Sequence, residues 1–221
     1  MSISKRNTVI QSFIASACVA LVSHTASAQP APTTPHDAAL CITCHGAHGE
    51  GAPTGAPRLA GQNAAYMSHA LSMFKAKTRA SPIMQPVAQT LSDAQMSKLA
   101  NYFANQTAPL ADMHSAAPAQ LLQAGKQLAE VGVANVAACF SCHGAHGKGN
   151  GARFPSIAGQ PAQFVTDRLH EFQARARAKA PQPGTMTAVA ATLDESQIQA
   201  AAVYLSRLEQ PQTTAAPAVQ E

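Results

Sequence analysis

The sequence predicts an all-α protein made of two tandem domains, and three observations support this fold class. The segments CITCHGAHGEG and CFSCHGAHGKG begin at Cys41 and Cys139, 98 residues apart, so the chain contains an internal repeat. Apolar residues elsewhere recur with the i, i+4 spacing of amphipathic helices, whereas the alternation typical of half-buried strands is missing. The length of 221 residues is sufficient for two small domains.

Each copy of the repeat contains a long amphipathic helix followed by a capped final helix. The first long helix is expected at residues 62–79, and its counterpart begins near Gln160, where Pro161 suits the first turn because its missing N–H costs nothing. The final helices are expected after SDAQ at Ser92 and DESQ at Asp194. Both segments resemble a capping box, in which a glutamine follows the capping residue by three positions.

The order of segments predicts an exported, two-domain chain. A charged start, an apolar stretch and the small-residue site ASA predict a signal peptide at residues 1–28, which places the mature protein in the periplasm. We expect a first domain at 29–108 and a linker rich in proline and small residues at 109–119. A second domain is expected at 120–208, followed by a disordered tail at 209–221.

The low net charge excludes one class of partner. The whole chain carries +4, and loss of residues 1–28, which include Lys5 and Arg6, leaves +2. Such a chain is not a polybasic nucleic-acid-binding protein. The same cleavage removes Cys18, so all four remaining cysteines lie in the two repeated motifs. A lipoprotein site at Cys18 is the weaker alternative, because the apolar run continues past it.

The CxxCH spacing of both motifs is the attachment signature of c-type haem. Cysteines three residues apart on a helical turn project to one side, where both can form thioethers with one porphyrin. The adjacent histidine then lies under the ring, where its imidazole can bind iron. The sequence therefore predicts two covalent haem groups. The residues involved are Cys41, Cys44, His45, Cys139, Cys142 and His143.

Other kinds of CxxC site fit the sequence less well. A zinc site needs four ligands, and each motif offers at most three convenient ones. A thioredoxin-like pair belongs in a strand–helix pattern that is absent from this sequence. A structural disulfide would account for the cysteines but not for the histidine repeated beside them.

Met84 and Met186 are the candidates for the sixth iron ligand. Of the seven methionines, only these two align between the copies, and each is expected in a proline-bearing loop ahead of a capped helix. A thioether ligand raises the reduction potential and suits electron transfer. His48 and His146 are the repeated alternative, but a separation of three residues from the motif histidine is too short to carry either side chain round the ring.

The exported chain resembles the dihaem cytochrome c4 family, in which two tandem class I cytochrome c domains each wrap around a covalently attached haem. The resemblance rests on CITCHG and CFSCHG, on the two AGQ segments and on the aligned methionines. It implies two haem c cofactors, and it implies that the carbonyls of Pro57 and Pro155 accept hydrogen bonds from the iron-binding imidazoles and fix their rings. The implied axial pairs are His45/Met84 and His143/Met186.

The resemblance implies an electron carrier rather than an enzyme. Expected donors are a quinol–cytochrome c reductase or a dehydrogenase, and the expected acceptor is a terminal oxidase. Family members are soluble or membrane-associated, so peripheral membrane association is open. Two alternatives are the cytochrome subunit of a periplasmic dehydrogenase complex and a dihaem oxidoreductase such as a thiosulfate dehydrogenase. The latter usually needs an open iron position or a reactive cysteine, and here thioethers use all four exported cysteines.

The two copies differ at their beginnings. Class I domains open with a helix that crosses the last helix, often at a glycine that lets the backbones approach. In the second copy AQLLQAGKQLAEVG, with Gly125, is a candidate for this helix. In the first copy the matching position falls inside the predicted signal peptide, so that helix is expected to be short or absent.

Overall fold

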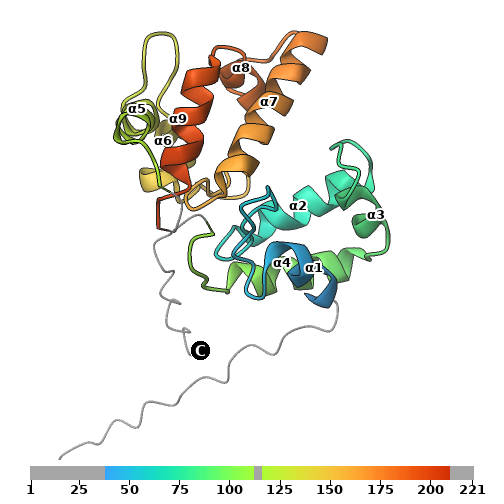
Figure 1. The fold of residues 1–221 in the computed structure, drawn as a ribbon. Coiled ribbons are helices and arrows are strands. Elements are labelled where there is room, and N and C mark those ends of the chain that lie inside the picture. Colours follow the sequence, from blue (N-terminus) through green and yellow to red (C-terminus); the bar gives the residue numbers. More distant parts are fainter. Residues whose placement is uncertain (1–37, 112–115, 210–221) are drawn as a thin grey trace, which may run out of the picture. The chain divides into compact units, whose positions relative to one another are not determined.

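The computed structural model describes residues 38–111 and 116–209. Within this part of the chain the regular structure is helical, with two isolated β-bridges, so the predicted all-α class is confirmed (Figure 1). The predicted signal peptide lies outside the described residues. No helix of the described part is both long and apolar enough to cross a bilayer.

The first copy of the repeat folds into four helices, coloured from blue to green in Figure 1. These are α1 (Ala38–His45), α2 (Ala64–Lys75), α3 (Met84–Gln89) and α4 (Asp93–Ala104). Helix α2 packs against α3 and α4, and their apolar faces enclose a core. The buried side chains of this core include Met67, Met96, Leu99 and Phe103.

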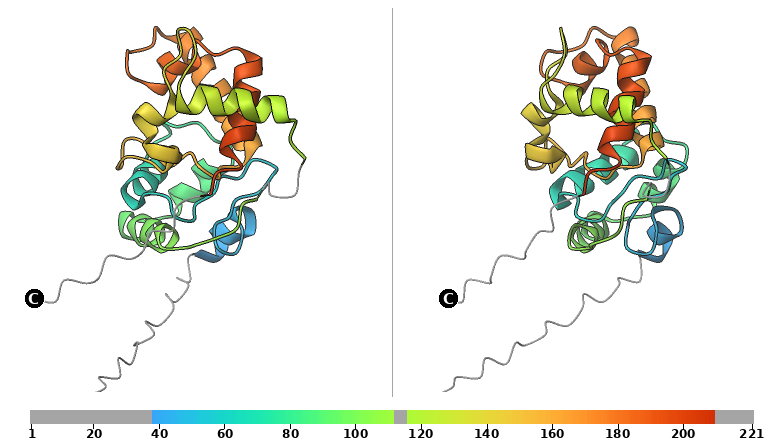
Figure 2. Two further views of the ribbon diagram at one scale, coloured as in Figure 1. Left: turned by 90° about the vertical axis from the view of Figure 1, so that its left-hand side faces the viewer. Right: turned by 60° about the vertical axis from the view of Figure 1, so that its left-hand side comes forward.

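The second copy has the same order of α-helices with one helix added at its start, and a 3₁₀ turn follows its CxxCH helix. Its elements are α5 (Ala119–Glu130), α6 (Cys139–His143), the 3₁₀ turn η1 (Ala145–Gly147), α7 (Ala162–Ala178), α8 (Met186–Ala190) and α9 (Glu195–Leu205). Both views in Figure 2 show α5 lying across α9. Their contact helps to bury Leu128, Ile198 and Leu205.

Capping boxes begin the final helix of each copy, as predicted. The Ser92 hydroxyl accepts the N–H of Gln95, whose side-chain oxygen accepts the N–H of Ser92. Asp194 and Gln197 form the same reciprocal pair, with distances of 2.8 and 3.0 Å. Two N–H groups without a partner inside the helix are thereby satisfied at each start, which fixes where α4 and α9 begin.

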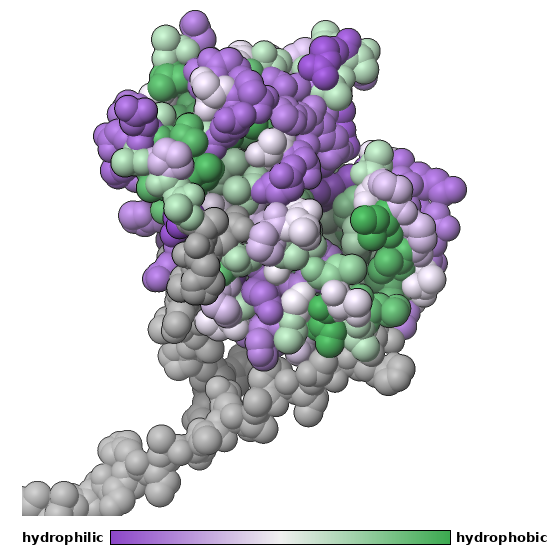
Figure 3. Space-filling view, viewed as in Figure 1, coloured by the Kyte–Doolittle hydropathy of each residue, from purple (hydrophilic) through white to green (hydrophobic). Residues whose placement is uncertain are grey.

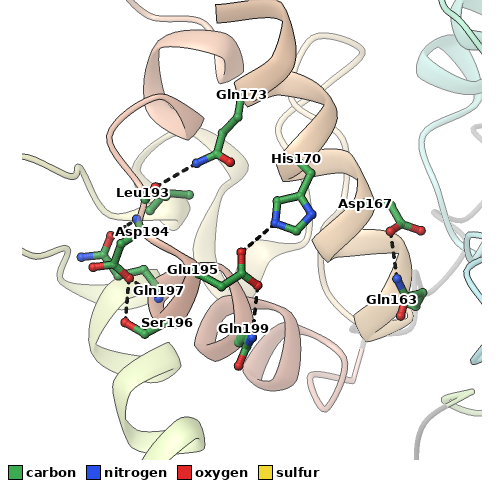
Figure 4. A network of polar contacts seen from close by, with 10 residues as sticks. All are labelled: Gln163, Asp167, His170, Gln173, Leu193, Asp194, Glu195, Ser196, Gln197 and Gln199. Atoms are coloured by element: carbon green, nitrogen blue, oxygen red, sulfur yellow. Dashed lines mark hydrogen bonds and ion pairs between the residues drawn. The ribbon is translucent and has the colours of Figure 1, made fainter. Parts of the chain in front are cut away.

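A second polar contact ties each long helix to the turn before its final helix, and Figure 4 shows it for the second copy. In the second copy Gln173 donates to the Leu193 carbonyl oxygen at 2.8 Å, and His170 lies 2.8 Å from the Glu195 carboxylate. In the first copy the ammonium of Lys75 donates to the Leu91 carbonyl oxygen. Lys75 aligns with Gln173, so different side chains provide the same connection in the two copies.

Some boundaries differ from those predicted. The helix expected at 62–79 spans only Ala64–Lys75, because Lys77 adopts a left-handed conformation with φ of 59° and ends it. Met84 and Met186, expected in loops, instead begin the short helices α3 and α8. Nearby hydroxyls explain this: Ser81 accepts the N–H of Met84, and Thr185 caps α8. Side chains that cap a helix start can support such short helices.

Gly125 lies where α5 crosses α9, as the sequence predicted. A Cβ atom at this position would lie 2.1 Å from the Ala200 carbonyl oxygen and 2.5 Å from Cβ of Tyr204. Only glycine therefore allows the two backbones to approach this closely. In the first copy, the residues before Ala38 are outside the described part, and the short or absent opening helix stays a prediction.

The surface mixes polar and apolar residues, as Figure 3 shows for the face seen in Figure 1. Among the described residues, the large hydrophobic side chains that are exposed are Leu40, Ile83 and Val131. Ile83 is 69% exposed and directly precedes Met84. The neighbourhood of this predicted iron ligand therefore includes apolar surface.

Candidate haem-binding sites

Both CxxCH motifs are helical: the first ends α1 and the second forms α6. In each motif the first cysteine is half-buried and the second is exposed. No disulfide joins the two cysteines of either motif. The motifs are thus compatible with thioether bonds to a porphyrin.

The protonation of Cys139 weakens the redox alternative to haem attachment. Burial raises the pKa of this thiol to about 11, so the thiol stays protonated at neutral pH. Thiol–disulfide exchange depends on the thiolate. Cys139 is therefore a poor nucleophile for that chemistry.

The two motif histidines are buried and held in the same way. His45 is 7% exposed, and its Nδ1 lies 2.8 Å from the Pro57 carbonyl oxygen. His143 is 5% exposed, and its Nδ1 lies 2.7 Å from the Pro155 carbonyl oxygen. Because the carbonyl can only accept, Nδ1 carries the proton and donates it, which leaves Nε2 as the nitrogen for a metal.

Burial also sets the charge of these imidazoles. It lowers the pKa of both His45 and His143, an effect that outweighs the opposing influence of the hydrogen bonds to the proline carbonyls. Both rings are therefore neutral at physiological pH. The neutral imidazole is the form that binds iron.

The glycine-rich segments after the motifs bring the proline carbonyls to the imidazoles. Gly51 and Gly149 donate their N–H groups to the carbonyl of the motif histidine, at 2.8 and 2.7 Å. Gly49 has φ of 76°, and a Cβ atom there would lie 2.8 Å from the Phe103 ring. A side chain at this position would be strained by its backbone conformation and blocked by its neighbour. These glycines therefore allow the chain to turn back tightly after each motif.

The predicted sixth ligands occupy equivalent places in the two copies. Met84 and Met186 are half-buried at the first positions of α3 and α8. Met186 packs against the same apolar core as Cys139. Among the described residues, hydrogen bonds connect each motif histidine to its proline but not to its methionine. The axial pairing therefore stays a prediction.

Two buried glutamines contact the site, and the sequence analysis treated them only as part of the AGQ segments. Gln160 accepts the N–H of Arg58 and donates to the Arg58 carbonyl oxygen, both at 3.0 Å. Gln62 does the same with Ser156, both at 2.9 Å. Each glutamine thus binds the residue that follows the proline in the other copy. The repetition of AGQ was the only signal for them in the sequence.

Arg58 also connects the first copy to the linker. Its guanidinium is buried and donates to the carbonyl oxygens of Ala108 and Pro109, each at 2.7 Å. Burial lowers the pKa of this arginine from its usual value. Ser156 occupies the equivalent place in the second copy, so this connection exists on one side only.

These features fit one haem c at each motif. Each motif combines two cysteines that are not joined to each other with a buried, neutral histidine whose Nε2 is left for a metal. The arrangement occurs twice, with matching distances, so both motifs support the same cofactor.

Comparisons with known proteins agree with this interpretation. The cytochrome c family matches residues 36–107 and 122–209. The chain is 35% identical to cytochrome c4 of Thiocapsa roseopersicina, over 77% of this chain and 88% of the relative. It is 36% identical to a thiosulfate dehydrogenase electron acceptor of Stutzerimonas stutzeri (strain A1501), over 80% of this chain and 82% of that protein.

Solved structures show the same relationship. Acidithiobacillus ferrooxidans cytochrome c4 is 34% identical with a TM-score of 0.66, and the match covers 76% of this chain and 98% of that one. The thiosulfate dehydrogenase TsdBA from Marichromatium purpuratum is 34% identical with a TM-score of 0.67, but this chain spans only 36% of its length. With two matched domains and two motifs of equal geometry, the chain belongs to the cytochrome c family as a dihaem electron-transfer protein of the cytochrome c4 type, with two haem c groups.

Proposed function

We propose that this dihaem cytochrome is an exported periplasmic carrier in which a histidine and a methionine bind each iron. The observation that supports this most directly is the pair of buried histidines, each bound through Nδ1 to a proline carbonyl. The alignment of Met84 with Met186 supports the sixth ligands, and the apolar N-terminal stretch supports export.

The bound haem supplies an iron that changes its valence by one electron. The chain's own residues do the rest: the cysteines fix the ring, and the histidines are held in one tautomer by Pro57 and Pro155. The two apolar cores exclude water from the inner side of each site. Since the histidine orientation is already set before any electron arrives, little rearrangement accompanies transfer.

The proposed route runs from respiratory-chain donors to a terminal oxidase. Suitable donors are a quinol–cytochrome c reductase or a periplasmic dehydrogenase. With one haem in each copy, one site can accept an electron while the other donates. The protein itself is not the catalyst in this proposal, because all four cysteines of the exported chain are used for haem attachment.

A specific observation favours a thiosulfate dehydrogenase as one donor. Two relatives are thiosulfate dehydrogenase electron acceptors, at 36% identity in S. stutzeri and 34% in Thiomonas intermedia (strain K12). We therefore propose that this cytochrome can accept electrons from an enzyme that oxidises thiosulfate.

Stopped-flow spectroscopy tests this donor. Oxidised cytochrome is mixed with a catalytic amount of purified thiosulfate dehydrogenase and excess thiosulfate, and haem reduction is followed in the visible spectrum. We expect reduction of both haems only when the enzyme is present. Reduction by thiosulfate alone, with turnover against an artificial acceptor, would instead make the cytochrome an enzyme.

Association with a dehydrogenase as a permanent subunit is the second candidate. The match to part of the longer M. purpuratum chain supports it. Size-exclusion chromatography of the native protein under mild conditions separates the two possibilities. A free carrier elutes alone, whereas a subunit co-elutes with its dehydrogenase in fixed ratio.

A further inference from the structure

We infer that Gln62 and Gln160 are crossed positioning residues, each of which sets the reduction potential of the haem in the other copy of the repeat. The inference rests on the proposed role of His45 and His143 as iron ligands. It concerns the N–H groups of the peptide units whose carbonyl oxygens bind those histidines.

One peptide group connects each histidine to a glutamine. The carbonyl of Pro57 and the N–H of Arg58 belong to the same peptide unit. Its oxygen accepts the His45 Nδ1–H at 2.8 Å, and its N–H donates to Oε1 of Gln160 at 3.0 Å. The peptide group therefore lies in series between an imidazole of the first copy and a carboxamide of the second.

The same series occurs in the opposite direction. The Pro155 oxygen accepts the His143 Nδ1–H at 2.7 Å, and the N–H of Ser156 donates to Oε1 of Gln62 at 2.9 Å. Gln62 and Gln160 are 98 residues apart, as are the two histidines. The contacts are thus reciprocal and follow the internal repeat.

The orientation of both carboxamides is determined by their partners. A backbone N–H can only meet the glutamine oxygen, and a backbone carbonyl can only meet the glutamine nitrogen. Each glutamine meets one of each, so a flipped amide would lose both hydrogen bonds. Gln62 and Gln160 are only 4% and 3% exposed, which keeps water from replacing either bond.

Hydrogen bonds in series through a peptide polarise one another. An acceptor at the N–H increases the negative charge on the carbonyl oxygen, which then draws the Nδ1 proton more strongly. The imidazole becomes a more electron-rich ligand and favours the oxidised iron. Each glutamine therefore lowers the reduction potential of the opposite haem.

The two glutamines differ in one respect that predicts an order. Oε1 of Gln62 also accepts the N–H of Asn63 at 3.0 Å. Gln160 is followed by Pro161, which has no N–H to offer. Gln62 divides its acceptor capacity between two donors, so the effect of Gln160 on the first haem is the larger one.

The test compares Gln160→Leu with Gln62→Leu in the full-length, haem-loaded protein. Redox titration is followed by NMR, with haem methyl resonances assigned to each copy, so that each potential is read separately. We expect Gln160→Leu to favour reduction of the His45 haem by up to about tenfold, or ~59 mV for one electron. Gln62→Leu should shift the His143 haem in the same direction by less.

The crossed pattern separates positioning from a general structural effect. A shift confined to the haem of the mutated copy, an equal shift of both haems, or no shift would overturn the inference. Crossed shifts of equal size would support the connection and overturn the predicted order. Each variant serves as the matched control of the other.

A measurement on the wild type decides the matter if the leucine variants do not retain two haems. Through-hydrogen-bond scalar coupling should connect the Arg58 nitrogen to the side-chain carbonyl carbon of Gln160, and the Ser156 nitrogen to that of Gln62. Missing couplings together with fast exchange of both amide protons would overturn the inference. A wild type with fewer than two haems, or with spectra that lack the absorption band of iron–methionine bonding, would instead contradict the proposed function.

Discussion

A thioether and an imidazole at the sixth iron position would give the haem different reduction potentials, because sulfur ligation favours the reduced state. In this protein the choice depends on Met84 and Met186, which align in sequence and begin equivalent short helices. The repeated His48 and His146 are exposed on the loops after the motifs. At the scale of single residues, the methionines are therefore the better candidates.

Replacing Met84 by histidine tests this assignment. We expect the potential of one haem to fall by on the order of 0.1 V, within the ~0.8 V range that axial ligands span. About half of the far-red absorption band of iron–methionine bonding should disappear, because one of two irons is changed. Redox titration and visible spectroscopy of the oxidised protein provide both measurements.

Met96→Leu is the matched control for this variant. Met96 is buried in the first apolar core, so the change should cost less than about 1.5 kcal/mol of stability and leave both potentials unchanged. An intact far-red band in the Met84→His, Met186→His double variant would rule out Met84 and Met186 as the iron ligands.

Between residues and the whole molecule, the decisive contact is the crossing of two helices. Helix α5 meets α9 at Gly125, where any side chain would collide with the Ala200 carbonyl. The second element-scale feature is the capped start of α9 at Asp194. The helix crossing depends on the absence of a side chain at Gly125. The helix start depends on the charged side chain of Asp194.

Gly125→Ala should destabilise the second copy by about 1–3 kcal/mol, although alanine is ordinarily the better helix former. The added Cβ would lie 2.1 Å from backbone oxygen, so α5 must move away from α9. Denaturant unfolding followed by circular dichroism measures the change. Gln123→Ala, at an exposed position of the same helix, should leave stability unchanged or slightly raised. Equal stability of Gly125→Ala and the wild type would show that the crossing is looser.

Asp194 should make the stability of α9 depend on pH. Hydrogen bonds from the Ser196 hydroxyl and the Gln197 N–H lower the pKa of this carboxyl below its usual 3.8. Because the folded pKa is below the unfolded one, the stabilisation is complete above the unfolded pKa and is lost as pH falls through the folded pKa. The acid side of the stability profile should therefore steepen below about pH 4.

Asp194→Asn provides the comparison, since asparagine caps a helix about as well and does not titrate. The unfolding free energies of both proteins are measured from about pH 7 down to about pH 2.5, a range that includes the pKa of an ordinary carboxyl group. We expect the wild type to lose more stability than the variant over this interval. Parallel curves would mean that the charge of Asp194 does not contribute.

At the scale of the whole molecule, charge determines how partners are found. Without the predicted signal peptide the chain carries only +2. Exposed apolar side chains such as Ile83 occur among its polar residues, and Figure 3 shows such a mixed surface. Strong electrostatic steering needs a large field of one sign. Recognition by partners should therefore depend mainly on short-range contacts.

The rate of reduction by a partner should consequently respond weakly to salt. Between about 10 mM and 300 mM ionic strength, we expect the bimolecular rate constant to change by less than about tenfold. Stopped-flow measurements with one donor at several salt concentrations test this. A decrease of a hundredfold or more would reveal a concentrated charged docking site.

The sequence by itself determined the features that repeat. Two CxxCH motifs, two AGQ segments and two capping boxes predicted the helical class, the two haem c groups and the family, because covalent attachment and helix capping depend on local spacing. The signal peptide, the domain limits and the axial methionines stay predictions. The sequence also predicted loops at Met84 and Met186, and this prediction was wrong. The structure has short helices there, which the hydroxyls of Ser81 and Thr185 support.

Only the tertiary structure decided what lies behind the haem ligands. The sequence offered Gln62 and Gln160 as parts of a repeated tripeptide, with nothing to indicate their partners. Folding places each carboxamide on a peptide group of the other copy, about a hundred residues away. Such a partner is chosen by the packing of the two copies against each other. Periodicity and spacing in the sequence predict only local structure, so they do not predict how the two copies pack against each other.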